Sequence, residues 1–339
     1  MKNKYTDIFL LNNNFSKCDH VKTITIYENN SNGDILPEVT IAIPTFKRHD
    51  LLKIALESAL NQKGVDNFEV IVIDNDPTRN CETELLMMDY IGNKVSYFKN
   101  EENIGMVGNW NRCISLARSK YITILNDDDW LEHGYLQFSL SSIRNTGEAL
   151  YFKSIIRDLR SGYNYQVSNT KLFFKKFVCL FSINQHKISI YDFFMAHMAS
   201  GTLGILYVKD NMLKLGGFDD RFFPAHDYVF NLNYKLNFGS VYIKKHLMNY
   251  RIASNESLNI ASEFAEVNYA IRMQIAKKYY YNSQIIKYYI KLLYEINYLD
   301  GIRYWNLNIS KLNENNFFKK LLRFIIKQYV IIRNLILYV

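Results

Sequence analysis

The residues with the clearest capacity for chemistry form one acidic run, Asn126-Asp127-Asp128-Asp129. Three neighbouring carboxylates repel one another, and a hard divalent cation with oxygen ligands relieves that repulsion. Such a run on its own is more often a solvated turn or the first turn of a helix. Here the apolar segment 121–125 leads directly into it, so the carboxylates follow the end of a predicted strand. This position favours a metal-binding loop.

A second feature with chemical capacity is the pair His226-Asp227, which follows the adjacent glycines Gly216 and Gly217 and begins a predicted helix. Paired glycines permit a tight turn, and a carboxylate beyond it can take the proton of an attacking hydroxyl group. Two structural interpretations compete. Asp227 can be only a favourable carboxylate in a first helical turn, and His226 can be a buried structural imidazole. These residues alone reject neither interpretation.

Alternating strands and helices must position these features. Apolar, β-branched segments predict strands at residues 39–43, 68–73, 95–98 and 121–125, and helices between them at 50–62, around 85–88 and at 107–117. Near-continuous apolar strands separated by helices are typical of a parallel sheet covered on both faces. The first half of the chain is therefore predicted to be a doubly wound α/β unit.

Polar residues gather where these strands end. The segments that follow the four strands are 44–48, 74–76, 103–105 and 126–129. Open α/β sheets bind ligands at the carboxyl ends of their parallel strands. We therefore expect these loops to form one ligand site.

The remainder of the chain is less regular. Its pattern predicts strands at residues 149–156, 202–208, 241–243 and 247–250, helices at 191–197, 228–236 and 264–281, and a mainly helical segment from residue 284 onward. We divide the chain into an N-terminal extension (1–37), a central domain (38–255) and a helical C-terminal region (256–339). The extension is rich in Asn and is expected to be a poorly structured lead-in or a small peripheral strand.

The charge of the chain is concentrated near its C-terminus. The 339 residues carry a net charge of +8, and residues 301–339 hold seven Lys or Arg against one Glu. The other residues therefore lack the basic stripe of a nucleic-acid-binding protein. Four scattered cysteines favour reduced thiols, and the sequence shows neither a signal-peptide core nor a run of about 18 apolar residues. We expect a cytoplasmic protein.

In order and spacing, five segments resemble the motifs of family 2 glycosyltransferases with the GT-A fold. They are Ile43-Pro44-Thr45-Phe46-Lys47-Arg48, Val72-Ile73-Asp74-Asn75, Asn103-Ile104-Gly105 with Asn111, Asn126-Asp127-Asp128-Asp129, and Gly216-Gly217-Phe218-Asp219 with His226-Asp227. The resemblance covers residues 38–252. It implies a mixed nucleotide-binding sheet flanked by helices, with a nucleotide half (38–130), an acceptor half (131–255) and a helical appendage.

The resemblance also implies a nucleotide-diphosphate sugar donor and inversion at the anomeric carbon by one displacement. Residues carried over to the nucleotide side are Pro44, Thr45, Phe46 and Arg48 in the pocket wall, Asp74 as acceptor of a hydrogen bond from the base, Asn103, Gly105 and Asn111 near the ribose and diphosphate, and Asn126 and Asp127 beside them.

For the metal and the base, the resemblance implies Mn²⁺ or Mg²⁺ on Asp128, with Asp127 directed to the ribose or the metal and Asp129 as a further acidic member. Asp227 is the implied general base. Two departures stand out. Asn126 occupies a position where many relatives have Asp, which leaves the liganding carboxylate open, and His226 replaces the Glu that often precedes the catalytic Asp.

The C-terminal segment 317–339 predicts an amphipathic helix. A narrow stripe holds Asn316, Lys320, Arg323, Lys327 and Asn334, and apolar residues cover most of the remaining surface. Such a helix suits an anionic membrane surface. The alternative is a packed terminal helix or an oligomer contact, and the pattern fits both equally.

The resulting hypothesis is a cytoplasmic inverting glycosyltransferase, peripheral at the inner face of the cell membrane, that adds a sugar to a lipid-linked saccharide in cell-surface polysaccharide (O-antigen or capsule) biosynthesis. A nucleotidyltransferase is the first alternative, although no Gly-rich phosphate loop with a Lys follows the first strand. A non-catalytic nucleotide-sugar-binding homologue and a nucleic-acid-binding protein are the others. We expect no nucleic-acid partner.

Overall fold

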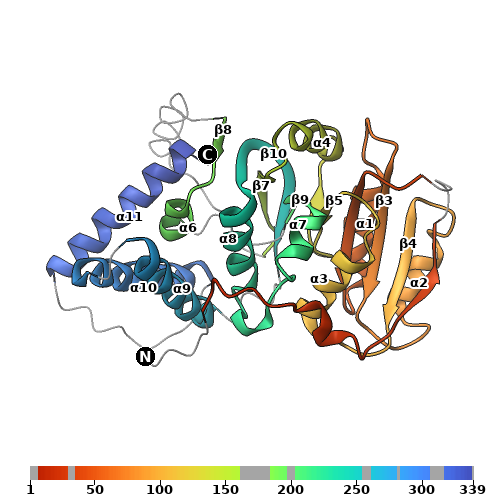
Figure 1. Cartoon of the computed structure of the whole chain (residues 1–339), viewed down its shortest axis with the longest axis horizontal. Coiled ribbons are helices and arrows are strands. Elements are labelled where there is room, and N and C mark those ends of the chain that lie inside the picture. The colour runs from red at the N-terminus through yellow and green to blue at the C-terminus, as the bar shows by residue number, and fades with distance from the viewer. Residues whose placement is uncertain are drawn as a thin grey trace.

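The computed structural model describes residues 7–29, 35–160, 184–196, 203–253, 261–280, 283–305 and 317–337. Its centre is a mixed sheet of ten strands in the order β1-β4-β3-β2-β5-β9-β7-β10-β6, with β8 beside β10 (Figure 1). The predicted α/β class is confirmed.

Four parallel strands form the part of the sheet that the first half predicts. They are β2 (Val39–Thr45), β3 (Phe68–Asp74), β4 (Val95–Asn100) and β5 (Tyr121–Ile124). β2 pairs with both β3 and β5, and β3 pairs with β4, always in parallel. All four predicted strands are confirmed, and their carboxyl ends meet at one edge of the sheet.

The second half of the chain continues this sheet in mixed directions. It supplies β6 (Trp130–Leu131), β7 (Ala149–Asp158), β8 (Gln185–Lys187), β9 (Leu206–Val208) and β10 (Ser240–Ile252). β9 lies antiparallel between β5 and β7, β10 runs parallel to β7, and β6 and β8 pair antiparallel with β10. The ligand edge therefore receives loops from both halves of the chain.

One strand division predicted in this half is wrong, and one predicted strand is shorter than expected. Residues 241–243 and 247–250 belong to one strand, β10, whose register shifts between Ile243 and Met248. The exposed Lys245 and His246 interrupt the apolar pattern there, which makes a bulge look like a turn in the sequence. The strand predicted at 202–208 begins at Leu206, and residue 202 lies outside the described residues.

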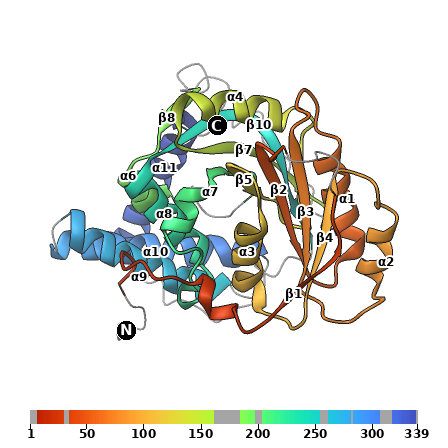
Figure 2. The ribbon, with the colours of Figure 1, turned by 45° about the vertical axis from the view of Figure 1, so that its right-hand side comes forward.

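Helices cover both faces of the sheet (Figure 2). α1 (His49–Leu60) and α4 (Tyr135–Thr146) pack on one face, and α3 (Gly105–Leu116) and α8 (His226–Phe238) pack on the other. Within β2, Ile41 and Ile43 belong to the first core and Ala42 to the second, as the alternation of side chains along a strand requires. The remaining helices of these layers are α2 (Glu82–Met88), α6 (Ile190–Ala196) and α7 (Lys209–Lys214), with short 3₁₀ turns η1 (Phe15–Cys18) and η2 (Asp220–Phe222).

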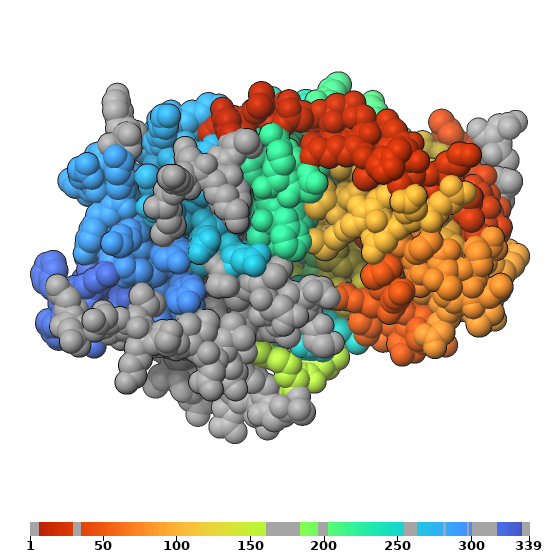
Figure 3. All heavy atoms as spheres, turned by 90° about the horizontal axis from the view of Figure 1, so that it is seen from below, coloured from red at the N-terminus to blue at the C-terminus, as the bar shows by residue number. Residues whose placement is uncertain are grey.

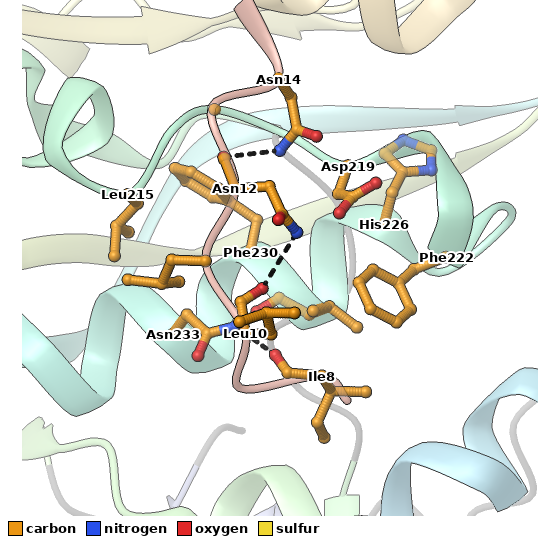
Figure 4. Close-up of a pocket in the computed structure, with 13 residues that line it drawn as sticks. Ile8, Leu10, Asn12, Asn14, Leu215, Asp219, Phe222, His226, Phe230 and Asn233 are labelled. Atoms are coloured by element: carbon orange, nitrogen blue, oxygen red, sulfur yellow. Dashed lines mark hydrogen bonds between the residues drawn. The ribbon is translucent and has the colours of Figure 1, made fainter. Parts of the chain in front are cut away.

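Residues 7–22 form a segment that we call the N-terminal strap. Ile8 is fully buried, its N–H donates to Oε1 of Gln274 at 2.9 Å, and its carbonyl accepts from Nδ2 of Asn233 at 2.7 Å. Farther along, the N–H of Asn14 donates to the carbonyl of Gly216 at 2.8 Å. Figure 3 shows the strap in red along one edge of the molecule, and Figure 4 shows it crossing α8.

The strap leads into β1 (Thr23–Tyr27), an edge strand that pairs antiparallel with β4. The small peripheral strand expected in the extension is thus confirmed. The other expectation, a poorly structured lead-in, is wrong for residues 7–22, because contacts with α8 and α9 order this segment. Residues 1–6 and 30–34 of the extension lie outside the described residues.

Three helices make up the C-terminal region, α9 (Ala261–Tyr279), α10 (Gln284–Trp305) and α11 (Phe317–Leu337). In Figure 1 they lie at the opposite end of the molecule from β3 and β4. α11 rests on α10 through Ile326, which packs against Leu292 and Leu293. None of the helices in the described ranges has both the length and the apolar character to cross a bilayer.

Candidate active site

The acidic loop after β5 meets the loop after β2. The hydroxyl of Thr45 donates to Oδ2 of Asp127 at 2.9 Å, and Nη1 of Arg48 lies 3.3 Å from both Oδ1 of Asp127 and Oδ2 of Asp128. The pairing of β2 with β5 in parallel dictates this meeting, because it brings both carboxyl ends to the same edge. The predicted Thr45, Arg48, Asp127 and Asp128 therefore form one cluster.

Burial raises the pKa values of the carboxyl groups in the acidic loop. It raises the pKa of Asp127 to about 6, although the Arg48 charge opposes the shift, and Asp128 adds to it. Burial likewise raises the pKa of Asp128 and, together with the Asp128 charge, that of Asp129. Ionisation of these carboxylates is therefore unfavourable in their present surroundings.

Asp129 faces away from this pair. Its Oδ1 accepts from the backbone N–H of Arg251 at 2.9 Å, and its Oδ2 accepts from Nδ2 of Asn126 at 3.2 Å. The Asn126 side chain therefore forms a hydrogen bond inside the 126–129 loop and helps to fix its shape. The side chain of Arg251 lies over the ring of Trp130 at 5.5 Å, and its charge lowers the pKa of Asp128. Sequence reasoning missed Arg251, whose only signal is its position just after the predicted strand 247–250.

The residues present fit a divalent cation that a substrate helps to bind. In the described parts of the chain, no three His, Cys, Asp or Glu side chains are gathered into a complete metal cage. Asp127 and Asp128 nevertheless share Arg48, and burial raises the pKa of both carboxylates. Mg²⁺ in particular is commonly held by one or two carboxylates together with substrate phosphates. A pair of this kind suits that arrangement better than a site built from protein ligands alone.

The loop after β2 has an exposed tip and a buried base. Pro44 is a buried member of β2 and lies under the loop, whereas Phe46 is exposed. Lys47 adopts a positive φ of 55°, so that the chain turns sharply before α1 begins. This turn directs Arg48 to the acidic loop and leaves the Phe46 ring exposed on the surface.

Asp74, at the end of β3, is fully buried and has several partners. Its Oδ2 accepts from the Tyr97 hydroxyl at 2.7 Å and from Nζ of Lys99 at 2.6 Å, and its Oδ1 accepts from the N–H of Asp76 at 2.9 Å. The hydrogen bond and charge of Asp74 raise the pKa of Lys99 against the opposing effect of burial. The carboxylate therefore has a structural partner in Lys99 besides the base contact predicted for it.

A network of asparagine amides shapes the loop before α3. Nδ2 of Asn75 donates to Oδ1 of Asn103 at 2.6 Å and to the carbonyl of Gly105 at 3.3 Å, while its Oδ1 accepts from Ile104 and Asn100. Gly105 has a positive φ of 73°, a conformation that favours glycine. Asn75, which sequence reasoning left without a role, thus holds the 103–105 loop against the end of β3.

Asn111 makes two hydrogen bonds to the turn before α8. Its Nδ2 donates to the carbonyl of Phe218 at 2.9 Å, and its Oδ1 accepts from the N–H of Phe218 at 2.7 Å. A Cβ on Gly217 would lie only 2.5 Å from Oδ1 of Asn111. The motif residues Asn111 and Gly217 therefore join α3 to the turn that precedes α8.

His226 and Asp227 begin α8, two residues earlier than the predicted helix start. Asp227 is 9% exposed, and its Oδ1 accepts from the N–H of Tyr228 at 2.7 Å. Burial raises the pKa of Tyr207 on β9, and the Asp227 charge is among those that raise it further. Asp227 is therefore close to β9, the neighbour of β5.

The imidazole of His226 is 2% exposed, and neither of its nitrogens has a hydrogen-bond partner in the described part of the chain. It stacks on Phe223 and lies 4.8 Å from the ring of Trp110. Burial lowers its pKa to about 4. His226 is therefore a neutral aromatic support beside Asp227 near pH 7.

Comparison with known proteins agrees with this geometry. The model described as "Glycosyl transferase family 2" matches residues 40–203. The GalNAc(5)-diNAcBac-PP-undecaprenol beta-1,3-glucosyltransferase of Campylobacter jejuni is 27% identical over 244 residues, which cover 71% of this chain and 74% of that protein. Residues 40–203 therefore form a glycosyltransferase family 2 domain. This glycosyltransferase is also 21% identical, over 255 residues, to UDP-Glc:alpha-D-GlcNAc-diphosphoundecaprenol beta-1,3-glucosyltransferase WfgD of Escherichia coli, a match that covers 73% of this chain and 92% of that protein.

Solved structures support the fold of the glycosyltransferase. Staphylococcus aureus TarS 1–349 in complex with UDP-GlcNAc superimposes with a TM-score of 0.55 at 15% identity, covering 88% of this chain and 81% of that one. Mannosyltransferase PcManGT from Pyrobaculum calidifontis, in complex with GDP-Man and Mn²⁺, superimposes with a TM-score of 0.53 at 12% identity, covering 89% and 86%. The GT-A architecture expected from the motifs is thus confirmed.

Proposed function

We propose that this glycosyltransferase transfers a sugar, with inversion, from a nucleotide-diphosphate sugar to a hydroxyl group of a lipid-linked saccharide in cell-surface polysaccharide biosynthesis. The observation that carries the proposal is the cluster of Thr45, Arg48, Asp127 and Asp128 at the carboxyl edge of the sheet. Its two undercompensated carboxylates and one guanidinium suit a metal ion together with a diphosphate.

On the donor side, Asp127 and Asp128 would hold the Mn²⁺ or Mg²⁺ ion. The bound ion supplies Lewis-acid stabilisation of the charge that develops on the leaving diphosphate. Arg48 adds a second positive charge next to both carboxylates. Thr45 orients Asp127 through its hydroxyl group, and Asp74 and the 103–105 loop border the nucleotide.

On the acceptor side, Asp227 accepts the proton of the attacking hydroxyl group. The carboxylate is largely enclosed in the first turn of α8, and the helix N-terminus favours its ionised form. The neighbouring His226 is neutral, so it adds no charge that would pair with Asp227. General-base catalysis of this kind typically contributes about 10²–10⁴-fold to a rate.

A lipid-linked acceptor is supported by two relatives. The names of the Campylobacter jejuni and Escherichia coli enzymes specify undecaprenol-linked substrates, and a third relative is a putative colanic acid biosynthesis glycosyl transferase. This chain covers most of the length of the first two. We therefore propose a lipid-linked acceptor for this protein, but we do not assign it the sugars named for those enzymes.

The test is a screen of nucleotide sugars for Mn²⁺-dependent hydrolysis by the wild-type protein, followed by the Asp227→Asn variant with the active donor and an acceptor. Transfer should fall by roughly 10²-fold or more, because the amide cannot take the proton. Donor affinity should change little. Wild-type transfer by Asp227→Asn, together with loss of transfer on substitution of Asp219 or Asp220, would place the base earlier in the chain.

A lipid-linked acceptor requires access to a membrane surface, and α11 is the element suited to provide it. Three of its cations are used to attach the helix to the protein: Lys319 and Arg323 pair with Glu295, and Arg333 pairs with Asp192. The stripe predicted to be polar therefore turns partly inward, with Arg323 buried. The opposite face exposes Phe317, Phe318, Leu321, Phe324, Ile325, Tyr329, Ile331 and Ile332.

This arrangement combines the two alternatives left open by the sequence, since α11 packs on the protein with one face and presents an apolar face outward. We propose an anionic bilayer as the occupant of that face, with the exposed Lys320 at its border. Phe318→Ser combined with Phe324→Ser should reduce co-sedimentation with phosphatidylglycerol vesicles about tenfold or more. A control, Leu85→Ser on the exposed surface of α2, should retain wild-type binding. Equal vesicle binding by all three proteins would contradict the proposal.

A further inference from the structure

A cavity of about 230 Å³ lies between the N-terminal strap, the start of α3 and the turn before α8. We propose that it is a saccharide subsite that binds one sugar ring of the acceptor. This inference rests on the proposed function and specifies which part of the chain recognises the acceptor. The subsite depends on residues 14–18, which precede the segment matched by the family.

The lining of the cavity has the composition that a sugar ring requires. Phe223 is 43% exposed, so an aromatic face is available for the C–H-rich face of a pyranose. Lys17, Asp220 and Asn14 supply a donor, an acceptor and an amide for its hydroxyl groups. Because Lys17 contacts both Asp219 and Asp220, these polar groups are already positioned relative to one another.

Asn14 gives an independent indication of a ligand. It is 4% exposed and lines the cavity, and its Nδ2 donates to the carbonyl of Asn12 at 3.1 Å. Its Oδ1 has no partner among the residues that the structure describes. Figure 4 shows the amide nitrogen bonded to the strap and the oxygen turned to the other side. Asn14 also lines the smaller cavity described below, and its Oδ1 has almost no accessible surface. A buried acceptor without a donor is unfavourable, and a sugar hydroxyl group would supply the missing hydrogen bond once the amide rotates toward the larger cavity.

The size of the cavity separates it from ordinary packing defects. A second cavity under the strap, shown in Figure 4, is only about 20 Å³ and has room for a single water molecule. By comparison, a cavity of about 150 Å³ holds benzene. A space of about 230 Å³ therefore accommodates a six-membered ring with its hydroxyl groups.

The position of the cavity matches the acceptor side of the reaction. Gly105, on its wall, belongs to the loop that Asn75 ties to the end of β3. Phe223, which also lines the cavity, stacks on His226 with ring centroids 6.0 Å apart, and Asp227 follows His226 in the chain. A sugar in the cavity would therefore lie between the nucleotide loops and the proposed base.

A phosphate group is a poorer occupant than a sugar. The first turn of α3 and Lys17 would attract an anion, but Asp220 also lines the cavity, and a second acidic residue, Asp219, shares Lys17. Lys17 is thereby already compensated by two carboxylates. A neutral polyol meets no such repulsion.

The experiment is saturation-transfer NMR on the full chain with the methyl glycosides of glucose, galactose, N-acetylglucosamine and N-acetylgalactosamine, with UDP or GDP and Mn²⁺ present. At least one glycoside should receive saturation from the wild type. Phe223→Ala and Asn14→Leu should each lower the affinity for that glycoside about tenfold, and Phe223→Trp should preserve the affinity. Tyr288→Ala, which removes an exposed aromatic side chain on α10, is the matched control and should bind the glycoside as the wild type does.

The nucleotide signals in the same samples distinguish the two proposals. Absence of UDP and GDP binding to the wild type would count against the proposed function itself. Normal nucleotide binding with no glycoside signal, or with equal glycoside affinity in Phe223→Ala and Tyr288→Ala, would overturn the subsite alone. Displacement of the glycoside by inorganic phosphate would reassign the cavity to an anion. Thermal unfolding of each variant shows whether a loss of glycoside binding arises from misfolding.

Discussion

Asp74 and Asp127 follow strands on either side of β2 and are both almost fully enclosed, yet their surroundings differ. Asp74 accepts from Lys99 at 2.6 Å and from Tyr97 at 2.7 Å. Asp127 accepts from Thr45 at 2.9 Å and shares Arg48, at 3.3 Å, with Asp128. The first carboxylate is compensated by the protein, whereas the second is left in need of a cation. Two buried acids at the same edge of the sheet can thus differ in how far the protein itself compensates their charge.

The largest expected effect comes from breaking the compensated site. Lys99→Met leaves Asp74 buried without its cation and should lower the free energy of unfolding by about 3–5 kcal/mol in urea denaturation. Arg144→Met is the matched control, because Arg144 pairs with Glu38 at the surface, and its loss should be below about 1 kcal/mol. Equal losses in the two variants would show that Asp74 does not depend on Lys99.

Removal of a carboxylate from the undercompensated site should affect activity and leave the fold intact. Asp128→Ala should lower sugar transfer roughly 10²–10³-fold and abolish its stimulation by Mn²⁺. Its free energy of unfolding without metal should be equal to or higher than that of the wild type, because one source of repulsion is gone. Full wild-type activity in EDTA would contradict the metal role.

The smallest expected effect is a pH dependence that only the undercompensated site should show. The pKa of Asp127 is about 6 in the folded protein and about 4 in the unfolded chain. Ionisation of Asp127 therefore lowers the free energy of unfolding as the pH rises from about 4 to about 6. Mn²⁺ needs the ionised form, so its affinity should fall about tenfold per pH unit below 6 and level off above it. Isothermal titration with Mn²⁺ alone, from pH 5 to 7.5, measures this. A flat profile would separate Mn²⁺ binding from Asp127.

Local patterns in the sequence predict the parallel core and its loops, because alternation and strand-end polarity are properties of a few adjacent residues. They also predict that Thr45, Arg48, Asp127 and Asp128 meet. The direction of Asp129 could not be predicted, because it is set by the N–H of Arg251, which lies 122 residues away. Asn111 shows the same limit, since its partner Phe218 is 107 residues away.

The amphipathic pattern of α11 likewise indicates a helix without showing which face is covered. Glu295 and Asp192, on other helices, determine that Lys319, Arg323 and Arg333 turn inward. A helical pattern in one segment contains no information about these partners. The exposed apolar face therefore becomes visible only in the structure.

The N-terminal strap also has a consequence for the order in which the chain assembles. Ile8 emerges early from the ribosome, but its partner Gln274 follows 266 residues later. At about 5–20 residues per second, this interval is on the order of 10–50 s. Strands β1 to β5 are synthesised within that time, but α9, which supplies Gln274, is not yet complete. The strap is therefore among the last segments to dock, and its contacts are of the long-range kind that slow folding.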